Sequence, residues 1–412
     1  MPVSNDPRLV LVLNSGSSSL KFAVHDTEHP TPLLSGIAER LGGGNGMITF
    51  KEADQKRVFP LETGTHTAAL DALLAELSHH GWLDRLAAVG HRVAHGGEHF
   101  THSTLITPEV VNDIDACSAL APLHNPAAVL GIRTAMARLP NIPHAAVFDT
   151  AFHQTLKPEA YLYALPMSLY REERVRRYGF HGTSYRYVAR EAVTLLGLDA
   201  NDHGLVIAHL GNGASATAVQ DGYSVDTSMG MTPLEGLVMG TRSGDVDAGA
   251  VMHIMRRRNL SVDQMDALLN KQSGLLGLTE LSNDVRELEA AAEGGHAGAQ
   301  FGLEVFVHRL ARYIGGLAMS LRRLDAVVFT GGIGENSVRM RAMTITRLRA
   351  LGLALHEASN AVTTGGTAGV ISASGSSAHI AVIPTNEEWM IVCDTAELAA
   401  AARSTGSLLE SA

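Results

Sequence analysis

Two arginines stand in glycine-rich segments whose composition suits the binding of anions. Arg92 lies within residues 90–97 (GHRVAHGG) and Arg242 within residues 240–244 (GTRSG). A guanidinium is a planar fork that can hold a carboxylate or a phosphoryl group at two points. A single loop arginine is more often a solvated surface group. Two of them between glycines, in a chain of net charge −10, favour a role in anion handling.

Three turns of small residues could approach phosphate groups closely. They are residues 14–19 (NSGSSS), 209–213 (HLGNG) and 330–336 (TGGIGEN), and each follows an apolar run. Backbone N–H groups and small side chains can surround a phosphate, and Lys21 after the first turn adds a positive charge. Ordinary hairpin turns have the same composition. The chain has no GxxxxGK[ST] P-loop, and the third turn lacks the glycine spacing of a dinucleotide fingerprint, so any phosphate site is of another kind.

Carboxylates follow two of the buried apolar runs. Asp149 comes directly after residues 145–148, and Glu387 follows residues 380–383 through a short Pro-Thr-Asn segment. The carboxyl ends of strands are where α/β proteins place ligand-binding groups. Carboxylates at such positions can hold Mg²⁺, which keeps much of its hydration shell. These acids are therefore candidates for metal binding or for orienting a substrate.

The histidines give weaker signals. His181 lies in a turn bounded by glycines before a predicted helix, where an imidazole can donate to a developing charge, although a single histidine is more often structural. His91, His95 and His99 are spaced like metal ligands on a helix. Residues 96–97 are both glycine and would interrupt that helix, so a zinc site is disfavoured.

The elements that position these residues alternate between strands and helices, which predicts an α/β fold. The strand–turn–strand pattern of residues 9–24 recurs at mid-chain, where aligning Leu13 with Leu210 brings Gly16 onto Gly213. Such a repeat suggests an internal duplication. Helical spacing of leucines is clear from Thr67 to His80, Tyr185 to Leu196 and Leu303 to Leu324.

The length and charge of the chain limit its function class. A chain of 412 residues suits two domains, which we expect at residues 1–149, with 386–412 packing back on them, and at 150–385. The net charge of −10 argues against nucleic acid or a membrane surface as partner. The N-terminus lacks a signal-peptide pattern, and no apolar run could span a bilayer. We therefore expect a cytoplasmic enzyme.

Eight motifs, in order between residues 10 and 388, closely resemble the acetate kinase family. They are LVLNSGSSSLKF, GHRVAHGGE, FDTAFHQT, RRYGFHGTS, HLGNGAS, GTRSGDVD, FTGGIGEN and PTNEE. The resemblance implies two duplicated actin-like (ribonuclease H-like) domains with a nucleotide cleft between them, and a homodimer. It also implies reversible, Mg²⁺-dependent in-line transfer of the ATP γ-phosphoryl group to acetate, giving acetyl phosphate and ADP. Mn²⁺ is a possible substitute for the metal.

The resemblance also implies a role for each matching position. Asn14 and Glu387 would hold the metal, and Arg92 would bind the carboxylate of the acyl substrate. Arg242 and His181 would stabilise the charge of the phosphoryl group in transfer, and Asp149 would orient the attacking carboxylate or the metal. The nucleotide would be bound by Lys21, His209, Leu210, Gly211, Asn212, Gly213, Asp284, Val285, Arg286, Gly332, Ile333, Gly334, Glu335 and Asn336. The alkyl end of the substrate would contact Ala94, Leu123, Phe180 and Pro233.

Two positions depart from the family pattern. Ala94 stands where acetate kinases commonly have valine, so the pocket has room for about one more carbon, and we predict measurable use of propionate. A propionate kinase, or a broad short-chain carboxylate kinase, is the alternative. Tyr185 stands where the family often has histidine, and the sequence does not assign it an effect.

Two further functions use the same fold. One is a non-catalytic ATP-gated module, in which Arg92, Asp149, His181 and Arg242 would have no evident purpose. The other is a sugar kinase, which would need a polar pocket that reads hydroxyl groups together with a base. The sequence leaves open acetate against propionate, the physiological direction of transfer, and the preferred nucleotide.

Overall fold

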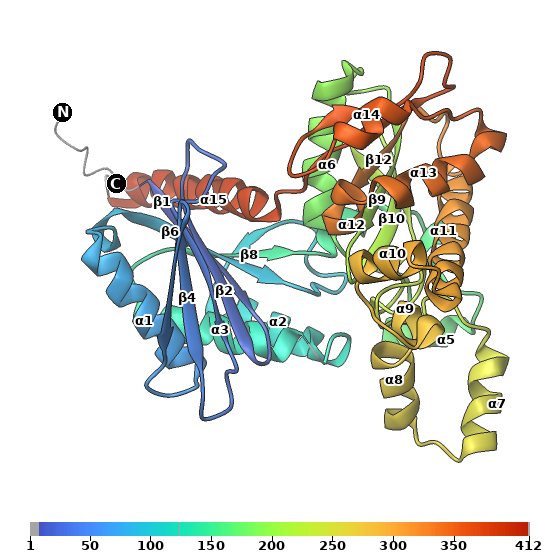
Figure 1. Cartoon of the computed structure of the whole chain (residues 1–412). Coiled ribbons are helices and arrows are strands. Elements are labelled where there is room, and N and C mark those ends of the chain that lie inside the picture. The colour runs from blue at the N-terminus through green and yellow to red at the C-terminus, as the bar shows by residue number, and fades with distance from the viewer. Residues whose placement is uncertain (1–7, 123, 411–412) are drawn as a thin grey trace. The chain divides into compact units, whose positions relative to one another are not determined.

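The computed structural model describes residues 8–122 and 124–410. These residues form two compact units (Figure 1). The first unit extends to Phe152 and resumes at Asn386, and the second runs from His153 to Thr385. Each unit is built around a β-sheet with helices packed on it, so the predicted α/β class is confirmed. No helix of the described residues is long and apolar enough to cross a membrane.

The first unit carries an eight-stranded sheet of order β5-β4-β3-β2-β1-β6-β8-β7. Its strands are β1 (Leu9–Ser15), β2 (Ser19–Asp26), β3 (Leu34–Glu39), β4 (Met47–Glu52), β5 (Gln55–Pro60), β6 (Leu86–Val93), β7 (Thr104–Leu105) and β8 (His144–Phe148). Its helices are α1 (His66–His79), α2 (Pro108–Ala116), α3 (Asn125–Arg138) and α15 (Glu387–Glu410), with 3₁₀ turns η1 (Leu83–Arg85) and η2 (Cys117–Ala119).

The two faces of this sheet pack against different helices, because side chains alternate along a strand. Leu9, Leu11 and Leu13 of β1 belong to the core that includes residues of α1 and α3. Val10 and Val12 point the other way, into a core shared with α15. The C-terminal helix, which begins at Glu387, is thus an integral part of the first unit and packs against the strands β6 and β8 (Figure 1).

The second unit carries a six-stranded sheet of order β11-β10-β9-β12-β14-β13. Its strands are β9 (Gly204–Leu210), β10 (Ala214–Gln220), β11 (Tyr223–Thr227), β12 (Ala326–Thr330), β13 (Gly369–Val370) and β14 (His379–Val382). Its helices are α4 (Pro158–Tyr161), α5 (Met167–Glu173), α6 (Gly182–Leu196), α7 (Ala248–Arg258), α8 (Val262–Lys271), α9 (Gly274–Thr279), α10 (Val285–Glu293), α11 (Ala297–Ala318), α12 (Gly331–Asn336), α13 (Val338–Arg347) and α14 (Glu357–Val362). The 3₁₀ turn η3 (Ala151–Thr155) crosses the boundary between the units, and η4 (Arg349–Leu351) follows α13.

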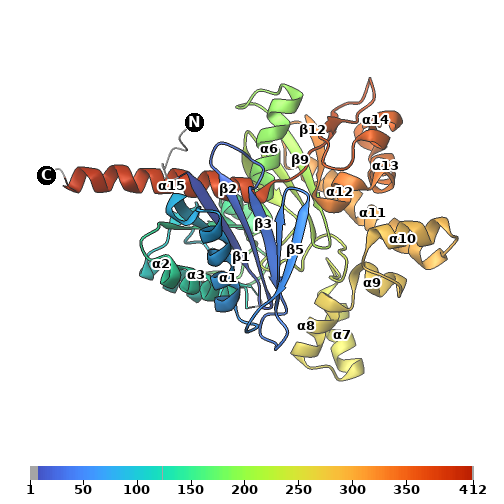
Figure 2. The same ribbon diagram turned by 60° about the vertical axis from the view of Figure 1, so that its left-hand side comes forward.

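The helices α6 and α11 cover opposite faces of β9 and β10 (Figures 1 and 2). The buried side of α11 packs into the largest core of this unit, which explains its spacing of apolar residues. The predicted helices at 67–80, 185–196 and 303–324 correspond to α1, α6 and α11. Each of the three begins before the predicted start, by one to six residues.

The internal duplication is visible in the topology of the two sheets. The order β3-β2-β1-β6-β8 in the first unit matches β11-β10-β9-β12-β14 in the second. In both, two antiparallel pairings are followed by two parallel ones. The predicted residue alignment is wrong by two positions. β1 ends at Ser15 and β9 at Leu210, so the first residue after each strand is Gly16 in the first unit and Gly211, not Gly213, in the second.

Candidate functional site

Three predicted site residues of the first unit meet at one edge of its sheet. β1, β6 and β8 are parallel, with Leu13 opposite His91 and Val93 opposite Phe148. Their carboxyl ends therefore lie at the same edge, where ligand-binding groups of α/β sheets are found. Asp149 follows the end of β8, as the sequence predicts. Asn14 and Arg92 were expected in a turn and a loop, but they lie in the last residues of β1 and β6.

Arg92 and Asp149 form a bidentate ion pair at this edge. Arg92 Nε donates to Asp149 Oδ1 at 3.1 Å and Nη2 donates to Oδ2 at 2.6 Å. The carboxylate is nearly buried, whereas the arginine side chain is 30% exposed. No residue of the described chain is hydrogen-bonded to Nη1 of Arg92. The pair therefore fixes the guanidinium plane and leaves one of its nitrogens available to a further anion.

Burial and a second carboxylate shape the electrostatics of this pair. Burial raises the pKa of the Asp149 carboxyl, and the opposing charge of Arg92 does not fully cancel that rise. The Glu387 carboxylate raises the pKa of Asp149 further, and it also helps Asp149 to raise the pKa of Arg92. Glu387, at the start of α15, thus lies close enough to act on both groups.

The donor set near Glu387 fits a hard divalent cation. The amide oxygen of Asn14 and the carboxylate of Glu387 are oxygen ligands of the kind that Mg²⁺ takes, with water completing its shell. The Glu387 carboxylate raises the pKa of Asp149, and a cation bound nearby would oppose that effect. Among the described residues no group of three or more His, Cys, Asp or Glu could hold a metal ion.

Two of the three histidines that were considered for a zinc site contact other residues instead. His91 is buried and donates from Nε2 to Nδ1 of His144 at 2.9 Å, while His144 Nε2 donates to the carbonyl of Leu139. Burial lowers the pKa of both imidazoles, so this pair is neutral. His99 is exposed, and its nearest acid, Asp113, is 3.6 Å away.

The second unit contains a cavity of about 500 Å³, which lies between residues 211–212, the start of α10 and the helix α12. Its lining residues are Gly211, Asn212, Asn283, Asp284, Val285, Arg286, Glu289, Gly332, Ile333, Asn336 and Ser337. Eight of these were predicted to bind the nucleotide. Asn283, Glu289 and Ser337 were missed, although Asn283 and Ser337 directly adjoin predicted residues. A cavity of this size would hold a nucleoside.

Local hydrogen bonds hold the walls of this cavity. Asp284 caps α10 by accepting from the backbone N–H of Arg286, and its carboxylate also pairs with the Arg286 guanidinium. Asn283 Nδ2 donates to Asn212 Oδ1 at 2.9 Å, which joins the two sides. Asn336 Nδ2 donates to the carbonyl of Gly332. The predicted nucleotide residues therefore also organise one another.

The turn that begins α12 depends on glycine and on a buried arginine. Gly331 has a φ of 74°, and a Cβ there would lie 2.8 Å from the carbonyl oxygen of Leu210, so only glycine fits. Glu335 does not line the cavity but accepts from the N–H groups of Gly331 and Thr385. Arg341 of α13, fully buried, donates to the carbonyls of Gly334 and Glu335 at 2.9 Å.

Arg341 was not identified from the sequence. Its remaining donors reach Asn360 Oδ1 and the carbonyls of Asn360 and Thr363. Burial lowers its pKa to about 10, so it stays charged at neutral pH. In the sequence it looks like any arginine of a helix, and only the fold shows that five acceptors surround it.

Arg242 lies against the second glycine-rich turn. Its Nη1 donates to the carbonyl of Pro233 at 2.7 Å, and a Cβ on Gly213 would lie 3.1 Å from its Nη2. Burial lowers the pKa of Arg242. Gly240 is needed for the same packing, because a Cβ there would lie 1.8 Å from Asn212 Oδ1. The structure thus brings Arg242 together with the turn 209–213.

His181 is held by α6 and by the hairpin β9–β10. It precedes α6 in the left-handed conformation, with a φ of 57°, which is uncommon for a residue other than glycine. Its Nδ1 lies 2.8 Å from Ser215 Oγ, and its ring stacks on His209 with 4.3 Å between centroids. The turn itself is anchored by buried His153, whose Nε2 donates to the carbonyl of Phe180 at 2.9 Å.

The structure describes three of the four residues that were predicted to contact the alkyl end of the substrate. Ala94 is half-buried just beyond the end of β6, and Pro233 supplies the carbonyl that binds Arg242. The side chain of Phe180 belongs to the hydrophobic core of the second unit. Leu123 lies outside the described residues. Their contact with a substrate remains a prediction.

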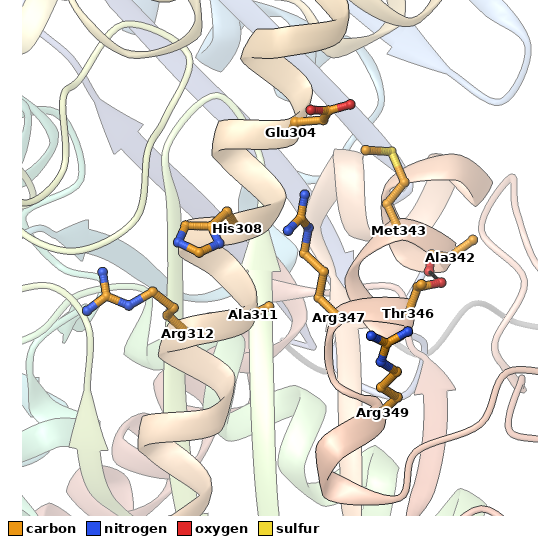
Figure 3. A pocket seen from close by; sticks show the side chains of 9 residues that line it. All are labelled: Glu304, His308, Ala311, Arg312, Ala342, Met343, Thr346, Arg347 and Arg349. Atoms are coloured by element: carbon orange, nitrogen blue, oxygen red, sulfur yellow. Dashed lines mark hydrogen bonds between the residues drawn. The ribbon is translucent and has the colours of Figure 1, made fainter.

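A second cavity of the same unit, about 720 Å³, lies between α11 and α13 and carries a different lining (Figure 3). It is open, and Arg347 extends into it between the two helices, while Arg312 points away from α13 (Figure 3). His308, Arg312, Arg347 and Arg349 are all exposed to solvent. No predicted site residue lines this groove, and we assign it no role.

A duplicated α/β fold with a nucleoside-sized cavity, strand-end carboxylates and arginines placed for anions fits a phosphotransferase of the actin-like class. Residues 9–393 match the model of the acetokinase family, and the chain belongs to this family. It is 54% identical over 390 residues to an acetate kinase of Chromobacterium violaceum, covering 95% of this chain and 98% of that one.

Other relatives include enzymes named for either short-chain acid. A propionate kinase of Yersinia enterocolitica is 52% identical over 396 residues, covering 96% of this chain and 97% of the relative. The crystal structure of Porphyromonas gingivalis acetate kinase is 40% identical and has a TM-score of 0.90, covering 95% of this chain and 99% of that one. The fold and family predicted from the sequence are thus confirmed.

Proposed function

We propose that this chain is an acetate kinase that transfers the γ-phosphoryl group of ATP to acetate, giving acetyl phosphate and ADP. The observation that carries the proposal is the Arg92–Asp149 pair. It presents a fixed guanidinium, with one nitrogen unengaged by described residues, at a strand edge that also bears Asn14. A pure nucleotide switch has no use for such a carboxylate-binding cation.

The reaction needs charge compensation more than acid–base chemistry. An acetate oxygen is already an anionic nucleophile, so it attacks the γ-phosphorus directly while the bond from phosphorus to the β,γ-bridging oxygen breaks. The main barrier is bringing two anions together in line. Arg92 would hold the carboxylate, while Arg242 and His181 would donate to the oxygens of the phosphoryl group in transfer.

Asp149 supports this reaction best as an orienting group. Its carboxylate is already engaged by Arg92 at both oxygens, so abstracting a proton is not its task. Asn14 and Glu387 would hold Mg²⁺, which when bound offsets the negative charge of the ATP phosphates. ATP would place its nucleoside in the cavity of the second unit, with Asp284 and Asn336 on its walls. Lys21, exposed opposite Asn14 in the β1–β2 hairpin, would contact phosphate.

Propionate kinase is the second candidate, because Ala94 leaves more room than valine and because a propionate kinase is 52% identical to this chain. The test is transfer from ATP with Mg²⁺ to acetate, propionate or butyrate, with the acyl phosphate trapped by hydroxylamine. Acyl phosphate formation would support the kinase, and the ratio of kcat/KM values would rank the acids. ATP binding without product from any acid would refute it.

The homodimer implied by the resemblance and the cytoplasmic location expected from the sequence stay predictions. Light scattering of the purified protein tests the first, and fractionation of the source cells tests the second.

A further inference from the structure

Tyr185 is the position at which this chain departs from its family's usual histidine, and its surroundings suggest a purpose. Its side chain is fully buried at the start of α6, one turn after His181. Its hydroxyl is hydrogen-bonded to Ser215 Oγ of β10, which is also fully buried. Ser215 Oγ is in turn 2.8 Å from Nδ1 of His181. Two hydroxyl groups therefore form a chain that ends on one nitrogen of the candidate phosphoryl-binding histidine.

We propose that Tyr185 is a positioning residue that, through Ser215, holds neutral His181 in the tautomer with its proton on Nε2. This inference rests on the proposed function, because it concerns how His181 serves that reaction.

The proposal takes Tyr185 as the donor to Ser215, which is one of the two directions that this contact allows. Each hydroxyl has one proton to donate. If Tyr185 donates to Ser215, then the Ser215 proton is free to be donated to Nδ1 of His181, which must then be unprotonated. The single proton of the neutral imidazole is left on Nε2, so that nitrogen is a donor. A donor can stabilise the oxygens of a phosphoryl group, whereas an unprotonated Nε2 would present a lone pair to them.

Further contacts hold the imidazole that stacks on His181. His209 of β9 stacks on it, and His209 Nδ1 is bonded to Ser184 Oγ at 2.8 Å. Ser184 Oγ also lies 2.7 Å from Thr385 Oγ1. Tyr185 itself packs edge-on against His153, which is neutral because burial lowers its pKa to about 4. Two adjacent residues of α6 thus fix two adjacent imidazoles through their hydroxyl groups.

The test compares Tyr185→Phe with the unaltered enzyme across a range of pH. The variant keeps the ring and loses only the hydroxyl, so Ser215 can also accept from Nδ1–H and the other tautomer becomes populated. We expect kcat near pH 8 to fall about three- to tenfold, the effect of one lost hydrogen bond, with little change in the KM of ATP or acetate.

The pH dependence separates tautomer control from a structural role. The imidazolium form of His181 carries a proton on Nε2 whichever tautomer the neutral ring had. The ratio of the two kcat values should therefore shrink toward one as the pH falls. A ratio that stays constant with pH would overturn the proposal, because a general disturbance of packing does not depend on the protonation of His181.

Matched variants complete the design. Tyr187→Phe removes a hydroxyl from the same helix two residues later and should leave kcat unchanged. Ser215→Ala should reproduce the loss, and adding Tyr185→Phe to it should cost nothing further. Tyr185→His, which restores a donor, should regain part of the activity. Additive losses in the double variant would contradict the chain of hydrogen bonds.

The outcomes also distinguish this inference from the proposed function. If the unaltered enzyme forms no acyl phosphate, the proposed function fails. If His181→Gln is as active as the unaltered enzyme, the role of His181 fails. If His181→Gln is impaired but Tyr185→Phe is not, only the relay through Tyr185 is overturned.

Discussion

Replacing Asp149 with asparagine tests whether the Arg92–Asp149 pair serves the reaction. The carboxylate accepts from Arg92 Nε at 3.1 Å and from Nη2 at 2.6 Å. An asparagine keeps one acceptor, but its amide NH₂ must then face the other guanidinium donor. One charge-assisted hydrogen bond is lost and the guanidinium plane is released. Because such a bond contributes about 1.5–3 kcal/mol, kcat/KM for acetate should fall about 10- to 150-fold.

The assay is acyl phosphate formation trapped with hydroxylamine at saturating ATP and Mg²⁺, with acetate varied. The first unit offers a matched control, because Asp71 of α1 makes the same bidentate contact with Arg138 of α3, at 2.6 and 3.0 Å. Both of those side chains are about half exposed. Asp71→Asn should leave turnover unchanged, since surface ion pairs contribute little. An Asp149→Asn enzyme within threefold of the original would refute the orienting role.

Three further predictions follow from other contacts. Ala94→Val should lower the ratio of kcat/KM for propionate over acetate, by at most about 1–3 kcal/mol of discrimination, and an unchanged ratio in the hydroxylamine assay would contradict the pocket assignment. Arg341→Lys leaves buried carbonyls without hydrogen-bond donors, and each such carbonyl costs about 1–3 kcal/mol of stability. The variant should therefore have a lower free energy of unfolding in urea, and its KM for ATP should rise more than its KM for acetate. Because the pKa of folded His153 is lowered from 6.5 to about 4, the unfolded chain binds its proton first as the pH falls. The contribution of His153 to the free energy of unfolding, about 3 kcal/mol, is therefore fully present above pH 6.5 and is lost as the pH falls from 6.5 to 4. Urea unfolding of His153→Gln should not show this pH-dependent loss.

Much of the fold could be predicted from local pattern. The strands β1, β8 and β12 are apolar runs ended by small or acidic residues, and α1 shows its leucine spacing directly. Position at a strand end was enough to make Asp149 a candidate site residue, because parallel strands bring their carboxyl ends to one edge. The duplication was detected from one short repeat. Its residue alignment was wrong because turns rich in glycine resemble each other in composition, and that resemblance does not show which residues occupy equivalent positions.

The supporting contacts of the site could not be predicted, because they join residues far apart in the chain. Arg341 holds a turn that precedes it by only six or seven residues, yet three of its acceptors come from residues 360–363. His153 reaches the carbonyl of Phe180, 27 residues later. No periodicity or motif encodes these partners. They arise only when separate strands and helices pack, and burial then forces each polar group to find a partner.

Tyr185 illustrates how a departure from a family pattern is interpreted. In the sequence it is a substitution of one aromatic residue for another, without an assigned effect. In the structure its hydroxyl is hydrogen-bonded to a buried serine that also contacts His181. The residue type at position 185 can therefore influence which ring nitrogen of His181 carries the proton. A histidine at position 185 could supply a donor too. A phenylalanine there would fit the space equally well but supply no proton. A hydrogen-bond donor, and not the ring alone, is therefore what the proposal requires at this position.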